Sequence, residues 1–218
     1  MQLNPRQEQF VELICAWGRK HLREFPWRNS ESPLEILVAE VLLQRTPAQR
    51  VEERFIQFRD RVLSVGASHR RDQIKREFRD LGLGKRIDWL LDALQIIEKE
   101  YSGRVPDAVE DLVLLPGVGR YTANAVLCLA YGRPVPMVDA NVIRILTRVF
   151  GLSVHQQSKP GSEVVALAAS LVPHDCARLY NLSMVDYGAL ICRKKPLCDD
   201  CPLVHLCLYY MCSRPADG

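Results

Sequence analysis

Four cysteines near the end of the chain have the spacing of a metal centre. They read Cys192-x5-Cys198-x2-Cys201-x5-Cys207, so four thiols fall within 16 residues. Short loops can bring four thiolates to one point, as structural zinc sites and iron–sulfur clusters both require. Structural zinc usually takes two short cysteine pairs that lie well apart, whereas this chain has one Cys-x2-Cys with a wider gap on each side. An iron–sulfur cluster, a zinc ion and four free thiols are the alternatives.

A second candidate site is the glycine-rich turn at residues 115–121, Leu-Pro-Gly-Val-Gly-Arg-Tyr. Gly117 and Gly119 have no Cβ, so the backbone N–H groups of this turn can approach a phosphate closely. An apolar helical stretch precedes the turn and a run of small residues follows it. We expect two helices joined by a tight turn that binds a phosphate backbone. A purely structural turn is the alternative.

Two carboxylates stand where they could do chemistry. Asp139 comes 22 residues after Gly117, at the start of a helical pattern. It can cap that helix, and a cap of this kind can also present its charge to a substrate on which positive charge develops. Glu40 is the single charge within the apolar run 36–43, and burial there would raise its pKa and keep it available as a proton donor. A Glu on the helix surface is the alternative for Glu40.

Composition fits a DNA-binding protein of the cytosol without requiring one. The chain has 218 residues, 48% hydrophobic and 25% charged, with a formal net charge of +3. No segment reaches the roughly 20 apolar residues that span a bilayer, and the N-terminus lacks a signal-peptide layout. We therefore expect a cytoplasmic protein whose cysteines are not disulfides. We expect three of the other cysteines to be small buried side chains: Cys15, Cys128 and Cys176. We expect Cys212 to lie outside the metal set.

Apolar residues recur at helical spacing nearly throughout, with no alternation of strand type. Glycines and prolines punctuate the pattern, and the sequence at 132–136 is the best candidate for a lobe boundary. We predict an all-α protein. The predicted helices are residues 5–22, 34–43, 47–62, 87–101, 107–115, 119–131, 138–149, 162–172 and 176–190.

The turn, Asp139 and the cysteine spacing together resemble the helix-hairpin-helix DNA glycosylases of the endonuclease III family, over almost the whole chain. The resemblance implies a two-lobed all-α fold with a C-terminal 4Fe–4S loop. Residues 28–133 would form a helical barrel lobe, and residues 1–27 plus 134–218 would form the cluster lobe. The partner would be double-stranded DNA with a mismatched or damaged base, bound by a monomer that associates with the nucleoid through DNA.

The resemblance also assigns ligands and DNA contacts. The family's cluster ligands correspond to Cys192, Cys198, Cys201 and Cys207. The family's first gap usually has six residues, and this chain has five. The basic loop with which the family contacts DNA corresponds to Arg193, Lys194 and Lys195, for which a solvated loop is the alternative. The DNA-binding hairpin corresponds to Gly117, Val118, Gly119 and Arg120.

Catalytic roles follow from the same resemblance. Asp139 matches the essential aspartate, Glu40 matches the glutamate that activates the base, and Asn141 matches a helper position. The turn that fills the vacated base stack corresponds to Gln44, Arg45 and Thr46. Members that also cleave the strand carry a lysine two residues after the second glycine, and here that residue is Tyr121. A phenol cannot form an imine, so we predict a monofunctional glycosylase in which Tyr121 lines the pocket.

Two monofunctional branches are candidates: enzymes that remove thymine or uracil opposite guanine, and enzymes that remove adenine opposite 8-oxoguanine or guanine. The chain ends eleven residues after Cys207, where adenine enzymes usually continue into another domain, and the segment 82–86 lacks the wedge tyrosine of that branch. The run 137–141 also looks most like the thymine branch. We favour removal of thymine or uracil. A non-catalytic, cluster-containing DNA-binding protein is a further alternative, although it has no use for two carboxylates.

Overall fold

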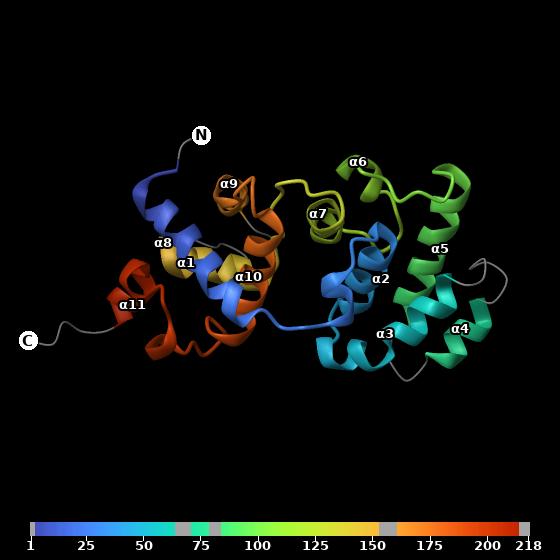
Figure 1. Ribbon diagram of the computed structural model, residues 1–218, viewed down its shortest axis with the longest axis horizontal. Coiled ribbons are helices and arrows are strands. Elements are labelled where there is room, and N and C mark those ends of the chain that lie inside the picture. The colour runs from blue at the N-terminus through green and yellow to red at the C-terminus, as the bar shows by residue number, and fades with distance from the viewer. Residues whose placement is uncertain (1–2, 64–70, 79–83, 153–160, 214–218) are drawn as a thin grey trace, which may run out of the picture. The chain divides into compact units, whose positions relative to one another are not determined.

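The computed structural model describes residues 3–63, 71–78, 84–152 and 161–213. Within these ranges the chain is helical and has no strand (Figure 1), which confirms the all-α prediction. The α-helices are α1 (Pro5–His21), α2 (Pro33–Leu43), α3 (Ala48–Leu63), α4 (Arg71–Glu77), α5 (Gly84–Glu100), α6 (Val109–Leu112), α7 (Arg120–Leu129), α8 (Ala140–Phe150), α9 (Ser162–Leu171), α10 (Ala177–Leu190) and α11 (Leu208–Ser213). Short 3-10 turns are η1 (Pro26–Asn29), η4 (Cys198–Asp200) and η5 (Val204–Leu206).

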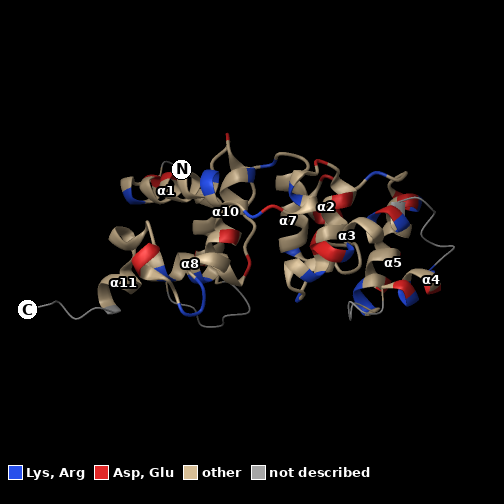
Figure 2. Cartoon of the chain, turned by 60° about the horizontal axis from the view of Figure 1, so that its bottom comes forward, with Lys and Arg blue, Asp and Glu red and all other residues tan. Residues whose placement is uncertain are grey.

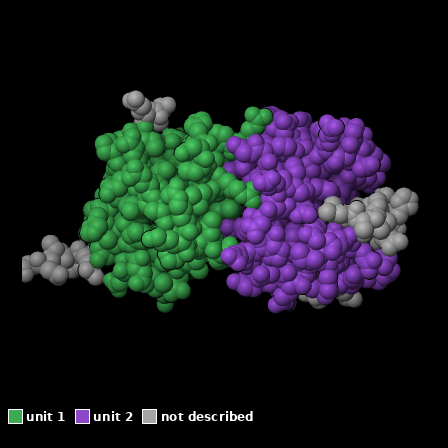
Figure 3. Space-filling model, viewed as in Figure 1, with its two compact units in different colours: residues 1–23, 133–218 green, residues 24–132 purple. Residues whose placement is uncertain are grey.

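The chain folds into two compact units (Figure 3). Unit 1 comprises residues 1–23 and 133–218, and unit 2 comprises residues 24–132. Unit 1 therefore holds α1 and α8 to α11, and unit 2 holds α2 to α7.

Unit 2 is built around α2. Pro33 occupies the first turn, and the Ser32 hydroxyl caps the helix by accepting a hydrogen bond from the N–H of Glu35 at 3.4 Å. Every residue from Ile36 to Leu42 is buried, because α2 packs against α3, α5 and α7. Such a helix must be apolar on all sides, and Glu40 is the charged exception.

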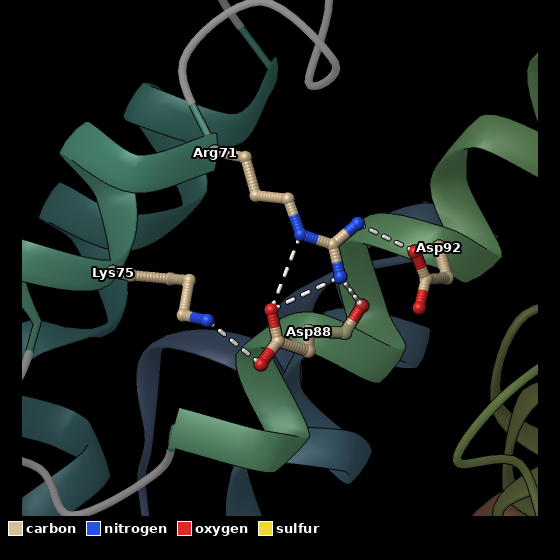
Figure 4. Close-up of polar contacts among 4 residues, drawn as sticks. All are labelled: Arg71, Lys75, Asp88 and Asp92. Carbon is tan, nitrogen blue, oxygen red and sulfur yellow. Dashed lines mark hydrogen bonds and ion pairs between the residues drawn. The ribbon is translucent and has the colours of Figure 1, made fainter.

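Ion pairs attach α4 to α5 (Figure 4). Arg71 contacts Asp88 at 3.0 Å and Asp92 at 2.6 Å, and Lys75 contacts Asp88 at 2.9 Å. These side chains are partly exposed, and Ile74 is the buried residue of α4. Since exposed ion pairs contribute little each, α4 depends on the whole cluster for its attachment.

Unit 1 is built on the packing of α1 against α10 and of α10 against α8. Asn4 and Gln7 form a capping box at the start of α1. After α1 ends, Arg23 binds the fully buried carboxylate of Asp186 on α10, with its side chain at 2.7 and 2.9 Å and its backbone N–H at 2.9 Å. The buried charge is thus paired, as its burial requires.

Some helices differ from prediction. The helix predicted at 107–115 spans only Val109–Leu112, because the chain then turns and leaves Val113 and Leu114 39% and 73% exposed. The helices α4 and α11 were not predicted, since each is too short for its periodicity to show. Among the residues described, no helix is long and apolar enough to cross a membrane.

Candidate active site and nucleic-acid interface

The predicted hairpin joins α6 to α7 in unit 2. Gly117 has φ +79°, and a Cβ there would lie 3.0 Å from the Cβ of Trp89, so the position requires glycine. A Cβ on Gly119 would instead meet open space. In the part of the chain that the structure describes, the N–H groups of both glycines have no acceptor. Two backbone donors are therefore available to an anion.

The residues beside these glycines differ in what they can offer. Val118 is buried, and its N–H donates to the carbonyl of Leu115 at 3.0 Å. Val118 therefore presents neither its side chain nor its N–H to a ligand. Arg120 is exposed in the first turn of α7, where its charge can reach a phosphate.

The turn at 44–46 is joined to the hairpin. The Gln44 amide donates to the carbonyl of Gly117 at 2.8 Å. Arg45 is exposed and has φ +56°, an uncommon conformation for a residue with a side chain. Arg86 supports the turn by donating to the Thr46 hydroxyl at 2.6 Å and to the Gln44 carbonyl. Gly82 and Leu83, at the predicted wedge position, lie outside the described residues.

Glu40 and Tyr121 lie on helices that pack together, α2 and α7. Glu40 is only 8% exposed, as its apolar neighbours predict. Tyr121 is half-buried in the first turn of α7, next to the hairpin. Unit 2 thus holds the hairpin, Glu40 and Tyr121.

Asp139 belongs to unit 1, where it caps α8. One of its oxygens accepts the N–H of Val142 at 2.8 Å, and the other accepts the side-chain amide of Asn141 at 2.8 Å. Burial raises the pKa of the Asp139 carboxyl above its ordinary value, and these donors, together with the charge of Arg144, oppose the rise. The carboxylate is held in one orientation, next to two donors and a cation.

Arg144 connects Asp139 to the segment 192–207 that carries the four predicted cysteine ligands, called the cysteine loop below. Its guanidinium donates to the Asn141 side-chain oxygen at 2.7 Å, to the Gly188 carbonyl at 2.8 Å and to the Cys192 carbonyl at 2.8 Å. A continuous series of contacts therefore runs from Cys192 through Arg144 and Asn141 to Asp139.

The four predicted cysteine ligands line one hollow in unit 1. Cys192 and Cys207 are buried, and Cys198 and Cys201 are half-buried. The Tyr187 hydroxyl lies 2.7 Å from the Cys201 sulfur. Burial raises the pKa of the Cys201 and Cys207 thiols, so a cation would be needed to hold them as thiolates.

The donor set consists of four thiols around one hollow. Within residues 3–63, 71–78, 84–152 and 161–213, no three cysteine, histidine or acidic side chains lie where they could hold one metal ion. The same four thiols nevertheless surround one hollow. Four thiols spread around such a space are the ligands that an iron–sulfur cluster uses.

Sequence reasoning missed the residues that support these sites. Arg144 and Tyr187 act through contacts far apart in sequence, for which periodicity gives no signal. Gly188 was also missed: a Cβ there would lie 2.5 Å from the Cβ of Asn141, so glycine makes room for that side chain. A glycine within the last turn of the helix predicted at 176–190 was the available signal.

Comparisons with known proteins agree with this geometry. A family model described as the helix-hairpin-helix motif matches residues 100–129. The thymine-DNA glycosylase of Aeropyrum pernix is 38% identical over 216 residues, 96% of each chain, and the thymine/uracil-DNA glycosylase of Methanothermobacter thermautotrophicus is 35% identical over 95% of this chain and 96% of that protein. The adenine DNA glycosylase of Mycobacterium tuberculosis is 35% identical over 98% of this chain and 72% of that protein.

Solved structures are similar as well. The structure of a thermostable thymine-DNA glycosylase matches with a TM-score of 0.83 and 35% identity, over 94% of this chain and 97% of that chain. A trapped endonuclease III–DNA covalent intermediate matches with a TM-score of 0.78 at 23% identity, over 97% of this chain and 99% of that chain, which supports the fold. The class of protein is therefore an all-α helix-hairpin-helix protein. The chain belongs to the helix-hairpin-helix DNA glycosylase family, which confirms the predicted membership.

Proposed function

We propose that the chain is a monofunctional DNA glycosylase that removes thymine or uracil opposite guanine and leaves an abasic site. The observation that carries the proposal is the Asp139 carboxylate, fixed at the N-terminus of α8 by the Val142 N–H and the Asn141 amide. Breaking an N-glycosidic bond builds positive charge on the sugar, and a fixed carboxylate stabilises that charge. The named relatives support the choice of base.

We propose a division of labour among the other residues. The N–H groups of Gly117 and Gly119, with Arg120, bind the DNA backbone while the target nucleotide flips out of the duplex. A side chain of the 44–46 turn fills the space that the flipped base leaves in the stack. If Gln44 does so, it must first break its hydrogen bond to the Gly117 carbonyl. A mismatched base flips more cheaply than a paired one, and this difference supplies part of the selectivity.

Glu40 and Tyr121 act on the flipped base. Glu40, which is buried, hydrogen-bonds to the flipped base or donates a proton to it. Tyr121 cannot form an imine with the sugar, so strand cleavage does not follow base release. Asn141 holds the Asp139 carboxylate ionised by donating to it.

Cys192, Cys198, Cys201 and Cys207 would hold a 4Fe–4S cluster. When bound, such a cluster cross-links the C-terminal loop and takes no part in proton or base transfer. The protein's own contribution is to hold the residues between the first two cysteines, Arg193, Lys194 and Lys195, against DNA phosphates. Double-stranded DNA is the partner, and the protein acts as a monomer.

Base release from a small panel of duplexes tests the proposal. Single-turnover reactions would use thymine or uracil opposite guanine, and adenine opposite guanine or 8-oxoguanine, with and without alkali. Release of thymine or uracil, with strand breaks only after alkali, is the expected result. Release of adenine alone would move the chain to the adenine branch, to which the Mycobacterium tuberculosis relative belongs. No release from any duplex would refute the proposal and favour a binding role.

A further inference from the structure

Arg148, in the last turn of α8, contacts the cysteine loop at successive points. Its guanidinium donates to the Arg193 carbonyl at 2.8 Å, to the Lys194 carbonyl at 3.1 Å and to the Cys192 sulfur at 3.5 Å. It also lies 4.9 Å from the centre of the Tyr209 ring. Base removal as proposed above does not use Arg148.

These contacts fix the backbone of the loop and leave its side chains outside. A planar guanidinium that donates to two successive carbonyls determines the local course of the chain. The basic side chains that follow Cys192 are exposed, and Figure 2 shows a basic stretch of loop beside α8. The ammonium groups of Lys194 and Lys195 make no hydrogen bond or ion pair with any residue that the structure describes. The loop therefore keeps two ammonium groups available.

The charges of this cluster point to an anionic partner. Arg148 adds a fourth positive charge beside Arg193, Lys194 and Lys195, and the Arg193 guanidinium itself donates to the Lys195 carbonyl at 3.3 Å. Positive charges on successive residues repel one another. DNA phosphates would relieve the repulsion and gain from the released counterions.

The position of Arg148 also relates the loop to the catalytic carboxylate. Asp139 caps the N-terminus of α8, and Arg148 lies nine residues later on the same helix. At 1.5 Å per residue the two are about 14 Å apart along a rigid element. We propose that Arg148 is a positioning residue, which fixes the loop Arg193–Lys195 for phosphate binding at a set distance from Asp139. This inference rests on the proposed function.

A double-mutant cycle tests the inference on the full holoprotein, with binding to an undamaged duplex measured at several salt concentrations. Lys194→Gln with Lys195→Gln should weaken binding about tenfold and lower the salt slope by about 2, since two phosphate contacts are lost. Arg148→Gln should weaken binding by a similar factor. In the triple variant Arg148→Gln should weaken binding by a smaller factor than it does in the wild type, because two of the three cations that Arg148 positions are already gone. Lys20→Gln, on α1, removes one charge from the same unit and should bind as the wild type does.

Base release separates positioning from a general loss of structure. With the thymine–guanine duplex, the Arg148→Gln variant should need more enzyme for half-maximal rate, while the plateau rate stays close to that of the wild type. Full additivity in the triple variant, or unchanged binding by Arg148→Gln, would overturn the inference. A lower plateau with unchanged binding would overturn it equally.

A second variant keeps the test decisive if Arg148→Gln fails to fold. Arg148→Lys retains the charge, but one ammonium cannot reproduce the fork of the guanidinium, so intermediate binding is expected. Binding equal to that of the wild type would show that charge alone suffices and would refute positioning. Since binding to an undamaged duplex needs no base release, failure of the proposed function would leave this result standing.

Discussion

At the N-terminus of α8 both oxygens of Asp139 accept hydrogen bonds, and Arg144 extends the contacts to the Cys192 carbonyl. At the hairpin of unit 2, Gly117 and Gly119 keep their N–H groups without an acceptor among the described residues. The first arrangement fixes a charge, and the second keeps donors free for a ligand. The difference suggests that reaction and DNA binding rest on separate features, so that substitutions should affect one and spare the other.

The largest effect is expected at Asp139. Asp139→Asn keeps the side-chain shape but removes the charge, so base release should fall by about 10³-fold or more, because the sugar cation loses its stabilising group. Duplex binding should stay the same or improve, since a negative charge near phosphates is removed. Single-turnover release and anisotropy binding, measured on the same preparation, check the two parts. Loss of binding would mean that the carboxylate is structural.

The next largest effect on base release is expected from breaking the contacts that run from Asp139 through Asn141 and Arg144 to Cys192. Arg144→Leu removes the donor to Asn141 and to the loop carbonyl, so the carboxylate shifts and release should fall by about 10- to 100-fold. Arg144→Lys should recover part of the rate, since it keeps one donor and the charge. The plateau of single-turnover release measures both variants. An unchanged plateau for Arg144→Leu would show that Asn141 alone positions Asp139.

At the hairpin the expected loss is in binding. Gly119→Val adds a side chain where the structure has open space, so folding should change little, while a phosphate can no longer approach the N–H group. Loss of one charge-assisted hydrogen bond corresponds to a roughly tenfold weaker duplex affinity. Anisotropy titration measures the effect. Unchanged affinity would place the phosphate elsewhere.

Gly117 separates strain from binding. Gly117→Ala should lower the free energy of unfolding by about 1–2 kcal/mol, because φ is +79° and the added Cβ would lie 3.0 Å from the Cβ of Trp89. Gly132→Ala is the matched control: it has φ +64° but open space around it. Both should unfold at lower denaturant concentration, and only Gly117→Ala should also weaken duplex binding. Equal binding by the two variants would remove Gly117 from the interface.

The smallest expected effect is on pH dependence. Base release requires ionised Asp139, so the rate should fall as pH decreases through the raised pKa of this carboxyl, at a higher pH than for an ordinary aspartate. Asn141 donates to the charged form and lowers the pKa, so Asn141→Leu should move the acid limb to still higher pH. The midpoint of the limb, not the rate, is the readout. A shift to lower pH would contradict this account.

The sequence predicted the helices better than it predicted the side-chain contacts between them. The apolar run in α2 and the periodic pattern of α8 were enough to place both helices, and the short α4 gave too few buried positions. Asp139 was predicted to cap α8 because it stands at the start of the helical pattern, and the structure confirms the cap. Its catalytic role was assigned by resemblance and stays a prediction.

Other parts of the sites could not be predicted from the sequence. Arg144 reaches Cys192, 48 residues away, and Gln44 reaches the Gly117 carbonyl, 73 residues away. Such contacts depend on how helices pack, and no local pattern encodes them. The cysteine spacing predicted which four thiols line one hollow, and the 4Fe–4S cluster stays a prediction from the spacing and the resemblance.

Release of thymine from a thymine–guanine duplex, measured against enzyme concentration for three proteins, tests the central claim most directly. The wild type should reach a plateau rate, with strand breaks only after alkali. Asp139→Asn should bind the duplex and release no thymine, while Gly119→Val should approach the wild-type plateau at higher enzyme concentration. Absence of thymine release by the wild type at any concentration, or loss of both binding and plateau rate through a single one of these substitutions, would contradict the account.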